Sequence, residues 1–110
     1  MITVLLVEDH DLLRLALKSG IDTQTDYAVI AEAAQGRQAV TFATALKPHI
    51  AIVDLGLPDM HGLDLIPLLR QHSPQTHIIV FSLQNEAAHV EAALARGAER
   101  FIAKGAPFTS

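Results

Sequence analysis

The sequence contains no cysteine in its 110 residues. This absence excludes disulfide bonds and metal sites built from thiolates, and it gives weak support to a reducing compartment. Long apolar runs are absent as well, since no stretch approaches the roughly 18 residues that a membrane-spanning helix needs. A signal peptide is not expected, because no basic segment precedes the first apolar run and acidic residues follow it at once.

Positive charge is scarce. Lys and Arg number 8 against 12 Asp and Glu, which gives a formal net charge of −4, and the sequence pI is about 5.8. The sequence shows no basic patch, so we do not expect this chain to bind nucleic acid directly. We predict a cytoplasmic protein that contacts no membrane.

Apolar residues, by contrast, are abundant and come in short segments. Half of the residues are hydrophobic, which is enough for the packed core of a single domain of this length. The segments are rich in β-branched residues and alternate with helical stretches, as in a parallel sheet that is buried on both faces. We predict strands at Ile2–Val7, Tyr27–Ala33, His49–Asp54, His77–Ser82 and Arg100–Lys104.

The stretches between these strands predict four helices, at Asp11–Gly20, Gly36–Leu46, Gly62–His72 and Asn85–Arg96. Gly20 and Gly97 fit the ends of helices, and Asn85 fits an N-cap. Right-handed crossovers then give an α/β fold, a doubly wound, flavodoxin-like sheet of five parallel strands in the order 2-1-3-4-5.

The segment after residue 104 has the pattern of a loop and the first residues of another helix. A sheet of this kind needs a fifth helix beside the first to cover one of its faces. We therefore expect residues 1–110 to be one domain that is truncated before its last helix. The apolar patch left by the missing fifth helix should lower stability and favour association.

Acidic residues and one lysine stand at the ends of the predicted strands. Glu8 and Asp9 follow the first strand, Asp54 ends the third and Lys104 ends the fifth. Because the carboxyl ends of parallel strands meet at one edge of the sheet, these side chains should share a pocket. Two carboxylates about 4 Å apart repel each other by roughly 4 kcal/mol at an effective dielectric near 20, and such hard oxygen ligands suit Mg²⁺. The pattern indicates a divalent-cation and phosphoryl site.

Each of these residues also has a purely structural explanation. Glu8 and Asp9 are favourable at a helix N-terminus, and Lys104 suits an exposed strand end. Ser82, at the end of the fourth strand, can bond locally or donate to a phosphate oxygen. An acid that directly follows a buried strand is poorly explained by solvation, so Asp54 favours the functional interpretation.

These residues match the pattern of a known family. Over essentially its whole length the chain resembles the receiver domain of two-component response regulators. The resemblance rests on the pair Glu8-Asp9, the stretch Asp54-Leu55-Gly56-Leu57-Pro58-Asp59-Met60-His61-Gly62, Ser82 and Lys104, which occur in the family's order and spacing. Gly97-Ala98 through Phe101 and Lys104-Gly105-Ala106-Pro107 are most similar to the NarL/LuxR-type subfamily. In that subfamily a helix-turn-helix DNA-binding domain usually follows the receiver.

The resemblance implies roles for the polar residues. Asp54 would accept a phosphoryl group from a histidine of a sensor kinase. Mg²⁺ would be held by Asp9, by Asp54 and by the backbone carbonyl of Gly56, with Glu8 acting through water. Lys104 would neutralise charge on the aspartyl phosphate.

The resemblance also implies a switch. Ser82 would move toward the phosphate, and Phe101, at the switch aromatic position, would turn inward as the hydroxyl moves. The chain would then be a slowly self-dephosphorylating switch rather than an enzyme. A sensor histidine kinase is the expected partner, a homodimer is a further possibility, and DNA would be reached only through an output domain that these residues do not include.

Some positions depart from the wider family. Gly56 is small and Gln84 is neutral and polar, and both flank the path of the hydrolytic water, so the phosphoryl lifetime stays open. Lys104 is followed by glycine rather than by proline. Of the six histidines, His10 and His61 lie in loops that border the predicted pocket.

Three other functions compete with this interpretation. Asp9-His10-Asp11 resembles the nucleophile motif of haloacid-dehalogenase-like phosphatases, but nothing after Lys104 supplies the further acids of that family, and Asp54 would lack a role. A flavin-binding module needs a phosphate cradle after the first strand, where this chain has acids that repel phosphate. A pseudo-receiver that only binds partners is disfavoured by the complete acid set and Lys104.

Overall fold

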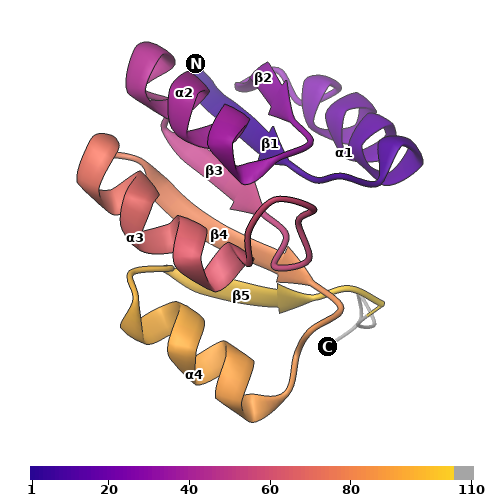
Figure 1. Cartoon of the computed structure of the whole chain (residues 1–110). Coiled ribbons are helices and arrows are strands. Elements are labelled where there is room, and N and C mark those ends of the chain that lie inside the picture. Colours follow the sequence, from indigo (N-terminus) through magenta and orange to yellow (C-terminus); the bar gives the residue numbers. More distant parts are fainter. Residues whose placement is uncertain (106–110) are drawn as a thin grey trace.

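The computed structural model describes residues 1–105 and shows a parallel sheet with helices on both faces (Figure 1). The strands are β1 (Ile2–Val7), β2 (Tyr27–Ala33), β3 (Ile50–Val53), β4 (His77–Ser82) and β5 (Arg100–Ala103). The helices are α1 (Asp11–Asp22), α2 (Gly36–Leu46), α3 (Gly62–His72) and α4 (Ala87–Ala95). The strands lie in the order β2-β1-β3-β4-β5, which confirms the predicted fold class and strand order.

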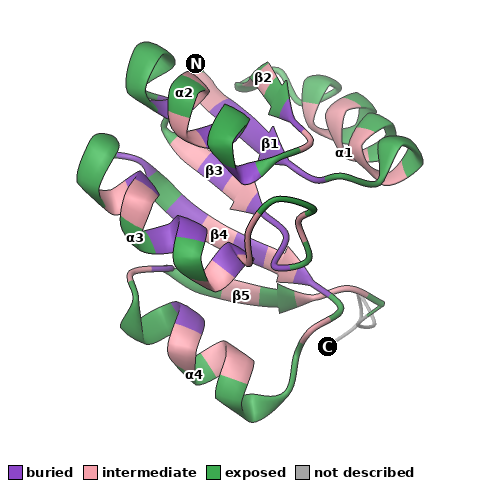
Figure 2. Cartoon of the chain, in the orientation of Figure 1, coloured by how far each residue is buried: buried purple, intermediate pink, exposed green. Residues whose placement is uncertain are grey.

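The core lies between the sheet and three of the helices. Helices α2, α3 and α4 lie side by side on one face, and α1 lies on the other (Figure 1). Because successive strand residues point to opposite faces, alternate positions of β3 and β4 are buried, whereas the last four residues of β1 are buried on both faces (Figure 2). The sheet contributes Leu5, Val7, Ala51, Val53, Ile78 and Val80 to this core, and α2 and α3 contribute Ala39, Ala43, Leu65, Ile66 and Leu69.

The sheet face that carries α1 is less completely covered. Ile50, Ile52 and Ile79 are only half-buried there, and Ile102 is 47% exposed. An apolar hollow of about 280 Å³ lies on this face, with Ile21 of α1 among its lining residues. The predicted absence of a fifth helix concerns positions outside the described residues. Within residues 1–105, part of this face is open.

Two predicted helix ends are wrong. Gly20 does not end α1, which continues to Asp22 and finishes where the Thr23 hydroxyl donates to the Gly20 carbonyl at 2.6 Å. A glycine inside a helix costs about 1 kcal/mol. The two residues that follow it place the Ile21 side chain in the lining of the apolar hollow, and partial burial of this side chain offsets the cost. Gly97, at a φ of 120°, follows α4 as predicted.

At the start of α4, Asn85 is not the N-cap. Glu86 occupies that position, and its side chain makes no capping hydrogen bond. Its carboxylate instead lies 2.6 Å from Nδ1 of His89, one turn along the helix. None of the helices in residues 1–105 is long and apolar enough to cross a membrane.

Candidate functional site

The sheet ladder fixes the backbone of the predicted site residues at one edge of the sheet. The N–H of Glu8 donates to Ala33 at 2.9 Å, and the N–H of Asp54 donates to Val7 at 3.0 Å. The backbone N–H of Lys104 donates to the backbone carbonyl of Ser82 at 3.0 Å. Each residue therefore extends the ladder by one bond beyond its strand, and its side chain emerges at the carboxyl edge, as predicted.

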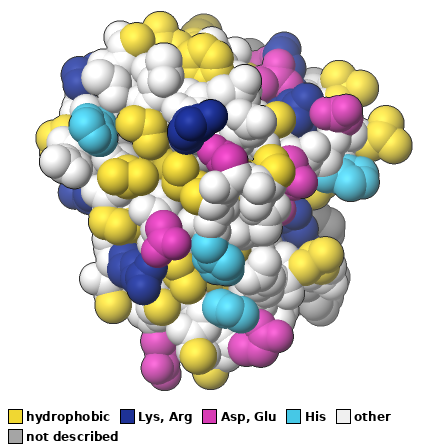
Figure 3. All heavy atoms as spheres, viewed as in Figure 1, with side chains coloured by type: hydrophobic (Ala, Val, Ile, Leu, Met, Phe, Trp, Pro, Cys, Tyr) yellow, Lys and Arg dark blue, Asp and Glu magenta, His cyan; other side chains and the backbone are white. Residues whose placement is uncertain are grey.

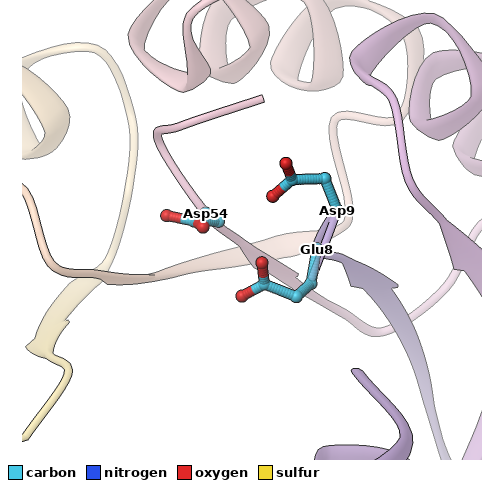
Figure 4. A group of neighbouring side chains, drawn as sticks. All are labelled: Glu8, Asp9 and Asp54. Atoms are coloured by element: carbon cyan, nitrogen blue, oxygen red, sulfur yellow. The ribbon is translucent and has the colours of Figure 1, made fainter. Parts of the chain in front are cut away.

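Three carboxylates gather at this edge. One carboxylate oxygen from each of Glu8, Asp9 and Asp54 lies within 4.8 Å of the others. Figure 4 shows the three side chains converging on one space. Glu8 and Asp54 are buried, at 3% and 8% exposure, whereas Asp9 is exposed. The cluster is therefore held by the core on one side and reachable from solvent on the other.

Lys104 binds both buried carboxylates. Its Nζ lies 2.7 Å from Glu8 Oε1 and 2.9 Å from Asp54 Oδ2. Burial alone would lower the pKa of Lys104, but the hydrogen bonds to the two carboxylates outweigh it and raise the pKa above its usual value. The ammonium also lies 5.7 Å from the centroid of the Phe81 ring, a distance at which a cation is attracted to the ring face. Lys104 is thus a fixed positive charge at neutral pH.

The two buried acids differ in their protonation behaviour. Burial raises the pKa of Glu8, and the nearby charge of Asp54 adds to that effect while Lys104 opposes it. Burial would also raise the pKa of Asp54, but hydrogen bonds from Lys104 and Ser82 outweigh burial and hold it below its usual value. Asp54 is therefore the better candidate for a carboxylate that stays ionised and reactive.

The loop after Asp54 folds back tightly on itself. The N–H of Gly62 donates to the Leu55 carbonyl at 2.8 Å, and a β-carbon on Gly62 would lie 2.6 Å from the carbonyl oxygen of Asp54. Only glycine fits this approach. The carboxylate of Asp59 accepts the N–H groups of Gly36 and Arg37, at 2.7 and 3.0 Å, and so ties the loop to the start of α2.

The predicted switch residues lie on the core side of the sheet. Ser82 is buried at 1% exposure, and its hydroxyl accepts the N–H of Gln84 at 3.1 Å. Phe101 is half-buried and packs against the core. Gly56, the predicted source of a carbonyl ligand, donates its N–H to Asp54 Oδ1 at 3.3 Å. The two loop histidines are N-caps, His10 for α1 and His61 for α3.

Sequence reasoning missed one residue that holds the acid cluster in place. Arg14 of α1 donates to the backbone carbonyl of Glu8 at 2.7 Å and to Asp11 at 2.8 Å, and it lies 3.5 Å from Glu32 of β2. It therefore fastens the start of α1 to the ends of two strands. Its position in the sequence could have indicated this role. Arg14 lies on the first turn of the helix that follows Glu8 and Asp9, and from there a long cationic side chain can reach back to a strand end.

The donor set fits a hard divalent cation. All three clustered groups are carboxylates, and the exposure of Asp9 leaves room for water ligands, the arrangement that Mg²⁺ prefers. Asp54 offers an ionised oxygen nucleophile within the same cluster, and Lys104 offers charge neutralisation. A carboxylate, a cluster suited to a cation and an ammonium can together supply the positioning and charge neutralisation on which phosphoryl transfer depends.

Comparison with known proteins agrees with this chemistry. The sequence model of the response regulator receiver domain matches residues 4–109. The nitrate/nitrite response regulator protein NarL of Escherichia coli K12 is 38% identical over 102 residues, which are 93% of this chain and 47% of that protein. The chain therefore spans about half the length of this curated relative.

Solved structures share the fold. A LuxR-family two-component response regulator from Aurantimonas sp. SI85-9A1 superposes with a TM-score of 0.89 at 29% identity, over 94% of this chain and 74% of that one. A response regulator from Burkholderia pseudomallei, with a phosphorylated aspartic acid, a calcium ion and citrate, gives 0.89 at 28% identity, over 99% and 63%. The chain belongs to the response regulator receiver domain family, within its NarL/LuxR-type subfamily.

Proposed function

We propose that Asp54 accepts a phosphoryl group from a phosphohistidine of a sensor kinase and that this modification switches the conformation of the domain. One observation carries the proposal: the buried carboxylate of Asp54, whose pKa is lowered, clusters with the carboxylates of Glu8 and Asp9 and binds Lys104 at 2.9 Å. The phosphorylated aspartic acid of the Burkholderia relative supports the same chemistry.

The transfer is an exchange of one bond to phosphorus for another. An oxygen of Asp54 attacks the phosphorus, a new O–P bond forms, and the P–N bond to the kinase imidazole breaks with its electron pair returning to nitrogen. Lys104 already binds Asp54 Oδ2 at 2.9 Å and can follow the negative charge as it moves onto the phosphoryl oxygens. Because such transfers need positioning and charge neutralisation above all, no further protein nucleophile is required.

Glu8, Asp9, Asp54 and the Gly56 carbonyl would hold Mg²⁺, with Glu8 acting through a water. When bound, the cation supplies neutralisation of the charge that develops on the phosphoryl oxygens. Within the chain, Asp9 is the exposed member of the cluster and is placed to meet a cation from solvent. Glu8 is held in the pocket by Lys104 at 2.7 Å.

The switch follows from what the phosphoryl group adds. Ser82 would turn its hydroxyl from the Gln84 N–H toward a phosphoryl oxygen, and Phe101 would follow inward. Hydrolysis would later reset the domain, so the chain acts as a phospho-acceptor with slow self-dephosphorylation rather than as an enzyme on a separate substrate. An output domain of the NarL/LuxR type would carry the signal to DNA, with a homodimer as the binding unit.

The test is incubation with acetyl phosphate and Mg²⁺ followed by mass spectrometry of the intact protein and its peptides. We expect one added phosphoryl group on Asp54 and none in Asp54→Asn. Asp64→Asn, which removes an exposed carboxylate on α3, is the matched control and should label like the parent. A label on Asp9 or Asp11 in the Asp54→Asn variant would point instead to the dehalogenase-like phosphatase.

The cation site has its own measurement. Titration calorimetry should give weaker Mg²⁺ binding in Asp9→Asn than in the parent, because one of three clustered carboxylates is lost. Equal affinities in the two proteins would argue against a site at this cluster.

A further inference from the structure

A hydrogen-bonded bridge joins the start of α3 to the loop between β4 and α4, beside the acid pocket. Nε2 of His61 lies 2.8 Å from Oε1 of Gln84. His61 also caps α3, since its Nδ1 accepts the N–H of Leu63 at 3.1 Å. Because Nδ1 is an acceptor, the proton of the neutral ring is on Nε2, and His61 therefore donates to the Gln84 oxygen.

The bridge determines which end of the Gln84 side chain faces the pocket. With Oε1 bonded to His61, the Gln84 NH₂ group lies over Gly56, where an added β-carbon would be 3.3 Å from Nε2. The N–H of Gly56 in turn donates to Asp54 Oδ1 at 3.3 Å. At its backbone, Gln84 donates to the Ser82 hydroxyl at 3.1 Å. The amide is thus anchored at both ends beside the Asp54 carboxylate.

The histidine that holds Gln84 is itself held. Its ring stacks on that of His89 in α4, with centroids 6.0 Å apart and planes at 24°. His89 is fixed in turn by the Glu86 carboxylate, 2.6 Å from its Nδ1. Figure 3 shows a pair of neighbouring histidine side chains on this face of the molecule. The orientation of His61 is therefore set by its cap, its stacking partner and the bridge together.

We propose that His61 is a positioning residue that holds the Gln84 carboxamide beside the pocket, where the pair screens an acyl phosphate on Asp54 from water. This inference rests on the proposed function. Oδ2 of Asp54 is bound by the Lys104 ammonium at 2.9 Å, whereas Oδ1 accepts only the longer hydrogen bond from the Gly56 N–H, at 3.3 Å. Oδ1 is therefore the oxygen that carries the phosphoryl group in this proposal.

The chemistry of hydrolysis explains why Gln84 screens rather than assists. A water oxygen bonds to phosphorus, the P–Oδ1 bond breaks, the Asp54 carboxylate is regenerated, and the protons of the water leave with inorganic phosphate and solvent. The Gln84 oxygen is occupied by His61, and its NH₂ group can only donate. Gln84 can therefore take no proton from the attacking water, and its volume keeps water from the Oδ1 side.

Two substitutions separate screening from helix capping. Asparagine is a good N-cap, so His61→Asn keeps α3 capped but is too short to reach Gln84, whereas Gln84→Ala removes the screen itself. Each variant is phosphorylated with acetyl phosphate and Mg²⁺, the donor is removed, and the first-order loss of the acyl phosphate is followed. We expect each single variant to lose phosphate about three- to tenfold faster, the effect of one neutral hydrogen bond.

The double variant and a loop control complete the experiment. Because both substitutions remove the same screen, the double variant should be no faster than either single variant. Asn85→Ala, in the same exposed loop, should keep the parent rate. An unchanged rate in His61→Asn, an unchanged rate in Gln84→Ala, or multiplication of the two effects in the double variant would each overturn the proposal.

Nitrogen NMR of the unphosphorylated protein gives a readout of the bridge that does not depend on phosphorylation. His61 should show the Nε2-protonated tautomer, and His61→Asn should shift the side-chain amide signals of Gln84 but not those of Asn85. If His61 were instead protonated at Nδ1, it could not donate from Nε2 to Gln84, and the proposed bridge would be wrong. If the bridge is present but the parent forms no acyl phosphate, the proposed function fails and the screening role fails with it.

Discussion

Among conservative substitutions at the acid pocket, Lys104→Met should lower the free energy of unfolding most. The Lys104 side chain is 12% exposed, and the side chains alone of its two partners, Glu8 and Asp54, are 4% and 11% exposed. Methionine keeps an unbranched apolar stem beside Phe81 but removes the charge that both carboxylates bind. Breaking a buried ion pair by removing one partner typically costs about 3–5 kcal/mol. We expect a loss of that size at pH 7, a large part of the usual margin of about 5–15 kcal/mol.

The loss should depend on pH in a definite direction. Without the ammonium, burial and mutual repulsion raise the folded-state pKa of both Glu8 and Asp54 above their unfolded values. A carboxyl with a raised folded pKa destabilises the fold at pH values above it, and the penalty disappears as the pH falls through that pKa because the folded protein then takes up the proton. The deficit of Lys104→Met should therefore be largest at pH 7 and smaller at pH 5.

Urea unfolding followed by circular dichroism measures this effect. Parent and variant are compared at pH 7 and at pH 5, with EDTA present so that no cation replaces the missing charge. Lys18→Met is the matched control, since it breaks an exposed pair with Asp22 on α1 and should shift the midpoint little. Equal midpoints for Lys104→Met and the parent at pH 7, or a deficit that is the same at both pH values, would refute the reasoning.

Four further substitutions have expected results. Asp59→Ala should cost about 0.5–2 kcal/mol at pH 7 by uncapping α2. The backbone donors outweigh burial and lower the pKa of Asp59 below its usual value, so this stabilisation is complete above the unfolded-state pKa and disappears as the pH falls through the folded-state pKa. A shift in the denaturation midpoint that persists unchanged at pH 2.5 would contradict it. Gly62→Ala should cost about 1–3 kcal/mol or more by overpacking, whereas Gly20→Ala, which meets nothing within 4 Å, should stabilise α1 by up to about 1 kcal/mol. Ser82→Ala should still accept phosphate but should weaken the amide shifts near Phe101 on phosphorylation, and undiminished shifts would argue against the switch.

The strands could be predicted because their signal is local. A run such as that of β1 is apolar on both faces, as a central parallel strand must be, and the residue after the run necessarily falls at the sheet edge. This is why Asp54 and Lys104, some 50 positions apart in the sequence, could be placed in one pocket without coordinates. The strand order then needed only right-handed crossovers.

The helix ends and loop contacts could not be predicted in the same way. Gly20 carries a local preference for helix ends, but α1 continues past it and places Ile21 among the residues that line the apolar hollow. Asn85 has the better capping side chain, yet Glu86 becomes the N-cap, with its carboxylate bonded to a histidine one turn later. The bridge between His61 and Gln84 joins two loops whose relative position is set by the packing of α3, so no spacing in the sequence indicates it.

The alternation of side chains along the strands also bears on the switch. In the sheet register Ser82 pairs with Ala103, and Val80 pairs with Phe101. Residues paired across parallel strands, and residues two apart along a strand, point to the same face, so Ser82 and Phe101 are diagonal neighbours on the core side of β4 and β5. Movement of the Ser82 hydroxyl toward a phosphoryl group would change the packing against Val80, the register partner of Phe101, and against Ala103, two residues beyond Phe101 on the same face. The proposed coupling therefore needs no relay outside these two strands.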